Sequence, residues 1–89
     1  MSHDLPYRLT NHAREEAERR SVPLAVLDAV LRAPGQIVPA HSGRRVYQSQ
    51  VEIGGKLYLV RVIVEETDPL TVITVYRTSN ISKYWSDAS

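Results

Sequence analysis

The sequence predicts an α+β fold, in which two N-terminal helices pack on one face of a small antiparallel sheet of three or four strands. Three observations predict it. Helix-forming residues fill 10–33, alternation of period two runs from about residue 44 to residue 78, and Gly54-Gly55 interrupts that alternation as a two-residue hairpin. The chain has 89 residues, so we expect residues 1–89 to form a single domain.

The first predicted helix spans residues 10–20, "TNHAREEAERR", with Thr10 or Asn11 as its N-cap. Glu16 and Arg20 stand in the favoured i,i+4 order. Its only apolar residues are two alanines, which predicts a surface helix that packs closely against the body of the domain.

A second helix follows, with Ser21 as its predicted N-cap and Pro23 in its first turn. The run "LAVLDAVLRA" is apolar on almost every side, which is typical of a largely buried helix. It should end at Ala33, before Pro34.

Three strands are predicted near 45–53, 56–65 and 70–78. Short segments near 36–40 and 7–10 are candidates for further strands. The residues "EETDPL" form the second turn, after the glycine hairpin.

Strict alternation fixes which side chains share a face. The hairpin sets Ile53 opposite Lys56, and a loop of even length at 66–69 sets Glu65 opposite Leu70, which buries Ile73. A loop of odd length would reverse the last strand. We prefer the even loop because it gathers Val and Ile on the face that the helices cover. The open face then carries Gln48, Gln50, Arg61, Thr74, Tyr76 and Thr78.

Composition excludes several classes of function. There is no Cys, so disulfides and thiolate sites are ruled out, and the three His residues have no ligand spacing that predicts a metal site or a cofactor. No apolar run is long enough to span a bilayer, and the N-terminus does not resemble a signal peptide. We therefore expect a soluble, cytoplasmic protein. Nine of its eleven cations are Arg, which favours bidentate contacts to phosphate or carboxylate groups.

Arg61 interrupts "YLVRVIVEE" in mid-strand, where a charge needs a partner or water. Either it pairs with Glu52 or Glu65 on a solvated face, or it binds an anion. His12, in the first turn of the first helix, is either a general base or an ordinary surface residue. Arg45 lies at a strand entry, from which it could reach phosphate groups at the rim of the open face.

The segment "RTSNISKYW" ends the last strand. Ile81, Tyr84 and Trp85 have i, i+3, i+4 spacing, so we expect them to anchor the C-terminus after a helical turn capped by Ser79. Lys83 should remain exposed.

Together, "LTNHAREEAERRSVP", the glycine hairpin and "VITVYRTSNISKYW" resemble a family of small bacterial domains of unknown function, over roughly residues 7–85. The family is placed with the barnase, EndoU, colicin-nuclease and RelE-like superfamily. His12 and Arg20 match the family's helix motif, and residues 74–76 match its closing strand. Family members often have Gly where this chain has Ser21.

The resemblance implies a RelE-like fold and a metal-independent endoribonuclease, the toxin of a toxin–antitoxin pair, with RNA (on or off the ribosome) and an antitoxin protein as partners. Cleavage would use the 2′-hydroxyl of RNA as nucleophile on the adjacent phosphate. The alternative is a non-catalytic module of the same fold that binds protein or nucleic acid. The catalytic candidates are His12, Arg61, Tyr76 and Thr78, and the phosphate-binding candidates are Arg20, Arg45, Thr74, Ser79 and Lys83.

Overall fold

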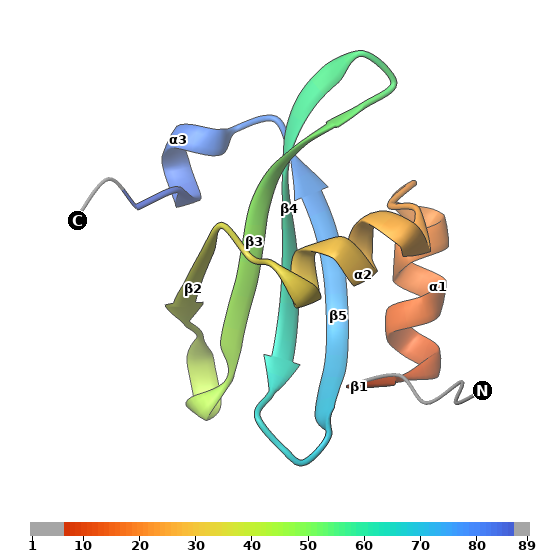
Figure 1. The fold of residues 1–89 in the computed structure, drawn as a ribbon, viewed down its shortest axis with the longest axis vertical. Helices are drawn as coiled ribbons and strands as arrows, with labels where there is room; N and C mark the ends of the chain where they lie inside the picture. The colour runs from red at the N-terminus through yellow and green to blue at the C-terminus, as the bar shows by residue number, and fades with distance from the viewer. Residues whose placement is uncertain (1–6, 87–89) are drawn as a thin grey trace.

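The computed structural model describes residues 7–86 and shows an α+β fold with a five-stranded mixed sheet (Figure 1). None of the helices in this part of the chain is long and apolar enough to cross a membrane. The elements, in chain order, are β1 (Tyr7–Leu9), α1 (Asn11–Arg19), α2 (Leu24–Arg32), β2 (Gln36–Pro39), the 3₁₀ turn η1 (His41–Gly43), β3 (Arg45–Ile53), β4 (Lys56–Glu65), β5 (Leu70–Thr78) and α3 (Ile81–Tyr84).

The sheet has the order β1-β5-β4-β3-β2. Both short candidate strands are present, so the predicted count of three or four strands was too low. The expectation of a purely antiparallel sheet was also wrong, because β1 pairs with β5 in parallel. This pairing is possible because α1, α2 and three strands lie between β1 and β5 in the chain and provide the long connection that parallel neighbours need.

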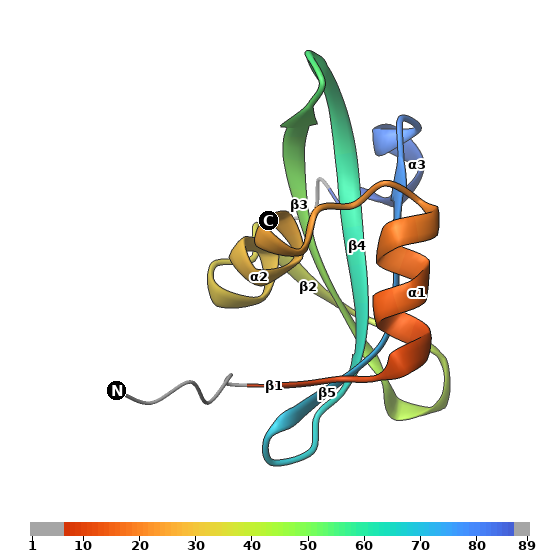
Figure 2. The ribbon, with the colours of Figure 1, turned by 90° about the vertical axis from the view of Figure 1, so that its right-hand side faces the viewer.

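The two N-terminal helices share one core with the sheet. In Figure 1, α2 crosses in front of the strands and α1 runs along β5; Figure 2 shows the two helices well apart, with the twisted sheet between their positions. Only one side of α2 is buried, and Leu24 is 44% exposed, so the prediction of a helix buried on almost every side was wrong. The core consists of Tyr7, Ala13, Ala17, Val22, Leu27, Val30, Leu31, Val60, Val62, Val64, Val72 and Val75.

The hairpin between β3 and β4 has the predicted register, with Ile53 opposite Lys56 and positive φ at both glycines. The register between β4 and β5 differs. Glu65 lies opposite Thr71 rather than Leu70, and a bulge separates this end of the ladder from the pairing of Ile63 with Thr74.

The bulge changes which β5 side chain is buried. Val72 is fully buried and the extra residue, Ile73, is only partly buried, so the prediction for Ile73 was wrong. Beyond the bulge the faces are as predicted. Val75 is buried opposite Val62, and Tyr76 lies opposite Arg61.

The face that carries Arg61 is not fully open. Gln48 and Leu59, both on this face, have no exposed surface. The C-terminal segment accounts for this at Gln48, whose side chain donates a hydrogen bond to the backbone oxygen of Tyr84 at 3.2 Å. The predicted anchoring of the C-terminus is therefore confirmed. The cap of α3 is Asn80 rather than Ser79, and its backbone N–H donates to Thr78 Oγ1 at 3.0 Å.

The chain reversal between α1 and α2 depends on Ser21. Thr10 caps the start of α1 as predicted, accepting from the Ala13 N–H at 3.0 Å. Ser21 was predicted to cap α2 but instead closes α1 in the left-handed region, with φ 56°, and Pro23 takes the N-cap position of α2. The Ser21 N–H donates to Glu18 O and the Val22 N–H to Ala17 O, which is a Schellman motif.

A small polar cluster links β1 to α2. The Tyr7 hydroxyl donates to Asp28 Oδ1 at 2.8 Å, and Arg32 Nε donates to Asp28 Oδ2 at 2.7 Å. Burial, followed by the hydrogen bond to Asp28 and its negative charge, raises the pKa of Tyr7 to about 12. The hydrogen bond from Arg32, and then that from Tyr7, hold the pKa of Asp28 below its usual value.

We predict that Ser21→Gly stabilises the protein. A side chain in the left-handed region costs about 1 kcal/mol relative to glycine, and Ser21 is exposed, so little contact is lost. The free energy of unfolding, measured by urea denaturation, should rise by about 0.5–1 kcal/mol. Ser82→Gly, inside α3, is the matched control and should not stabilise; equal gains in both variants would contradict the assignment.

Titration of Tyr7 should weaken the fold at high pH. Its pKa is raised on folding, so its contribution is fully present below pH 10, the ordinary tyrosine value, and is lost as pH rises through about 12. We expect the native chain to lose about 1–2 kcal/mol more unfolding free energy than Tyr7→Phe between pH 9 and 12. Parallel pH curves for the two chains would show that the phenol does not titrate in this way.

Candidate anion-binding site

A row of four polar side chains crosses the sheet from β2 to β5. Gln36 lies directly opposite Gln48, Gln48 opposite Arg61, and Arg61 opposite Tyr76. Directly opposed residues share a face and approach closely. Here every neighbouring pair is hydrogen-bonded: Gln48 Nε2 donates to Gln36 Oε1 at 2.9 Å, Arg61 Nε to Gln48 Oε1 at 2.8 Å, and Arg61 Nη1 to the Tyr76 hydroxyl.

Arg61 is held in place by neutral groups. Two aromatic rings flank its guanidinium, whose central carbon lies 4.3 Å from the ring centroid of Tyr84 and 5.6 Å from that of Tyr76. Such contacts favour a cation without neutralising it. The two tyrosines meet edge to face, at 6.3 Å between ring centroids.

Arg61 forms no ion pair within the described part of the chain. Of the two alternatives for Arg61, pairing with Glu65 or Glu52 does not occur: Glu65 pairs with Arg44 at 3.2 Å, and Glu52 is exposed at the far end of β3. The reason is register, since Gln48 occupies the position opposite Arg61. A guanidinium has five N–H donors, of which these two bonds use two. The remaining donors and the positive charge are available to an anion.

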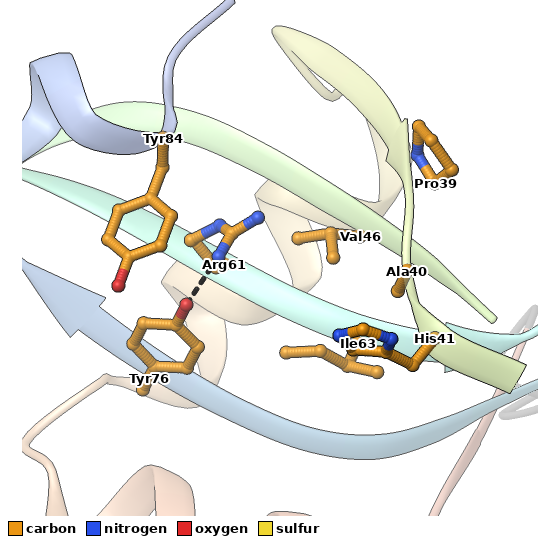
Figure 3. Close-up of a pocket in the computed structure, with 8 residues that line it drawn as sticks. All are labelled: Pro39, Ala40, His41, Val46, Arg61, Ile63, Tyr76 and Tyr84. Atoms are coloured by element: carbon orange, nitrogen blue, oxygen red, sulfur yellow. Dashed lines mark hydrogen bonds between the residues drawn. The ribbon is translucent and has the colours of Figure 1, made fainter.

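Arg61 lies at one end of a cavity of about 540 Å³ (Figure 3). Figure 3 shows one guanidinium nitrogen directed toward Tyr76 and another directed over Val46, into the cavity. The imidazole of His41, from η1, lies over Ile63 on the opposite side. The lining residues are Pro39, Ala40, His41, Val46, Arg61, Ile63, Tyr76 and Tyr84.

Tyr76 lines the cavity and still has a hydroxyl hydrogen to donate. Its hydroxyl oxygen accepts a hydrogen bond from Arg61, so its own hydrogen must point elsewhere. A cation, a hydroxyl donor and an imidazole thus border one partly apolar space. This combination can bind an oxyanion and move a proton at its edge.

The structure brings together only two of the predicted catalytic residues, Arg61 and Tyr76. Thr74 and Thr78 share their face on β5, opposite Ile63 and Leu59, but do not line the cavity. Ser79 is exposed beyond the end of β5. Lys83 is exposed on α3, with Nζ 5.2 Å from the ring of Tyr84.

The other predicted residues lie outside the cavity. His12 is exposed in the first turn of α1. Arg20 donates from Nε to Glu16 Oε1 at 2.8 Å; this hydrogen bond is the main reason why the pKa of Glu16 is lowered. Arg45 pairs with Glu66 at 2.9 Å. Residues 7–86 contain no cluster of three His, Asp or Glu side chains that could hold a metal ion.

Four residues of the site, Gln36, Gln48, Tyr84 and His41, were not predicted as site residues. Gln48 could have been found, because the glycine hairpin alone sets it opposite Arg61. Tyr84 was predicted as an anchor, but nothing in its spacing indicated contact with Arg61. His41 was treated as an ordinary loop residue, since only the tertiary structure brings η1 over Ile63.

Comparison with known families gives one match. The family model of DUF4258, a domain of unknown function, matches residues 9–77. The chain belongs to the DUF4258 family. No curated protein and no solved structure gives a significant match.

The DUF4258 match contains most of the site. Gln36, His41, Gln48, Arg61 and Tyr76 all fall within residues 9–77. Tyr84 and the rest of α3 lie beyond the matched region. The site of this DUF4258 chain therefore combines the family domain with a C-terminal segment outside the match.

Proposed function

We propose that this DUF4258 chain is a metal-independent endoribonuclease of the RelE-like type, which acts in the cytoplasm as the toxin of a toxin–antitoxin pair. One observation carries the proposal: Arg61, fixed by Gln48 and Tyr76 and with no carboxylate partner among residues 7–86, lines a cavity that His41 also lines. The placement in the RelE-like superfamily and the antitoxin partner follow from the resemblance described above.

The reaction needs a base, an acid and a cation. The 2′-hydroxyl of RNA gives its proton to the base while its oxygen attacks the adjacent phosphorus; the P–O5′ bond breaks, and the 5′ oxygen takes a proton from the acid. The products are a 2′,3′-cyclic phosphate and a 5′-hydroxyl. Arg61 would bind the phosphate as its negative charge increases, since its free N–H groups and its charge point to the cavity.

The proton-transfer roles follow from position. Histidine is the side chain most often used for this purpose at neutral pH. His41 borders the cavity, whereas His12 does not, so His41 replaces His12 as the candidate general base. Tyr76 points its hydroxyl hydrogen away from Arg61 and would stabilise the phosphate or protonate the leaving oxygen.

A second candidate, a binding module without catalysis, is favoured by the charge distribution. Among residues 7–86, five of the nine arginines are paired with acidic side chains, and the net charge of the chain is only +1. This leaves little free positive charge for a long RNA contact. In this case the cavity would bind a single phosphate or carboxylate of a partner.

The proposal is tested with a labelled single-stranded RNA and the purified chain in EDTA. We expect cleavage to products with 2′,3′-cyclic phosphate ends, identified by mass spectrometry. Arg61→Ala and His41→Ala should lower the rate by about 100-fold or more, and Tyr76→Phe by about 10-fold. On induced expression, the native chain should arrest growth and Arg61→Ala should not.

Arg77→Ala is the matched control. Arg77 is the neighbour of Tyr76 on β5 and also stacks on a tyrosine, Tyr58, at 4.2 Å, but on the opposite face of the sheet. The Arg77→Ala chain should cleave RNA at the same rate as the native chain. If no chain cuts RNA, the ribonuclease is excluded; phosphate binding that depends on Arg61 would then support the binding module.

A further inference from the structure

The C-terminal segment, residues 81–86, is bound to the same row of side chains that holds Arg61. Tyr84 contributes both its backbone oxygen, which accepts from Gln48, and its ring, which lies against Arg61. Ser86 exchanges two hydrogen bonds with the side chain of Gln36, the first member of the row. Trp85 lies against Gly35, just before β2.

Gln48 is the junction between this segment and Arg61. Its side chain has no exposed surface, and its Oε1 accepts from Arg61 while its Nε2 donates to Gln36 and to Tyr84. Only one orientation of the amide satisfies all three bonds, because the carbonyl faces a donor and the NH₂ group faces two acceptors. A buried amide with unmet bonds is costly, so losing one side of this arrangement weakens the other.

Tyr84 also controls the surroundings of the guanidinium. Its ring centroid lies 4.3 Å from the central carbon of Arg61, so it keeps water from that face of the cation. A cation shielded on one face and held by neutral groups interacts more strongly with an anion in the cavity than a free surface arginine does.

We propose that docking of residues 81–86 positions Arg61, with Gln48 as the positioning residue, so that the segment and the site form one cooperative unit. The inference deepens the proposed function, and its consequence for RNA cleavage rests on it. When the segment is docked, Arg61 is fixed for its anion. When it is displaced, Arg61 loses its fixed orientation and the cavity loses the wall that Tyr84 provides.

The structure offers a way to displace the segment by a substitution at Gly35, which lies outside the row and does not line the cavity. A Cβ at Gly35 would lie 2.9 Å from the Trp85 ring, too close for both to stay, and 3.4 Å from the Gln48 backbone oxygen. Gly35 does not have a positive φ, so the backbone accepts Ala. Gly35→Ala should therefore push Trp85 aside while the fold remains intact. Trp85 is the only tryptophan, so its fluorescence reports this movement alone.

The test compares native, Gly35→Ala and Gln48→Met chains, with Ser82→Ala as the control on the exposed side of α3. Tryptophan emission measures docking, and exchange of the Arg61 Nε–H with solvent, followed by ¹⁵N NMR, measures positioning. Both variants should shift the emission to the red and speed the exchange at least 10-fold. Gln48→Met is close to glutamine in size but can neither accept from Arg61 Nε nor donate to Tyr84 O.

The two proposals fail in different ways. If the variants show red-shifted tryptophan emission but unchanged exchange of the Arg61 Nε–H, the coupling between docking of the segment and positioning of Arg61 is overturned. This holds whether or not the chains cleave RNA. If native emission is already that of a solvent-exposed tryptophan, the docking itself is refuted. Faster exchange in both variants, with no RNA cleavage by any chain, would keep the coupling and refute the ribonuclease. If the ribonuclease activity and the coupling both hold, the Gly35→Ala chain should also cleave RNA at least 5-fold more slowly than the Ser82→Ala chain.

Discussion

The hydrogen bond from Arg61 to Gln48 is the interaction on which the site depends. It holds a charged side chain in the middle of a sheet with no acidic partner in the described part of the chain, and it uses a fully buried amide to do so. An ion pair at this position would satisfy the arginine and leave it inert toward other anions. An amide satisfies one N–H and leaves the charge uncompensated, so the cation remains available to a ligand.

The same constraint explains why the two faces of the sheet differ so strongly. Valines from β4 and β5 fill the face under the helices, where the close packing needs no polar partners. The opposite face carries four polar residues in register, and each is hydrogen-bonded to its neighbour on the next strand. The surface arginines differ from Arg61, since five of them in the described part of the chain pair with acidic side chains, three within a helix and two between the start of β3 and the end of β4.

Much of the fold could be predicted because it follows from local patterns. Alternation and the glycine hairpin determined the long strands and set Gln48 opposite Arg61. The bulge at Ile73, the parallel β1 and the role of Ser21 could not be predicted, because each depends on contacts between segments far apart in the sequence or on a left-handed backbone that serine rarely adopts. For the site, Arg61 and Tyr76 followed from the alternation, whereas His41 depends on how η1 folds over the sheet.

The pairing of β1 with β5 affects how the protein is made. Thr10 at the start of α1 bonds to Val72 O, 62 residues later, and the row of polar side chains needs Tyr76 and then the segment that contains Tyr84. Such distant contacts form late, after the intervening chain has left the ribosome. The sheet and the site are thus completed only when synthesis of this region is nearly over. A nascent chain that has not yet emerged as far as Tyr84 therefore lacks the assembled Arg61 site.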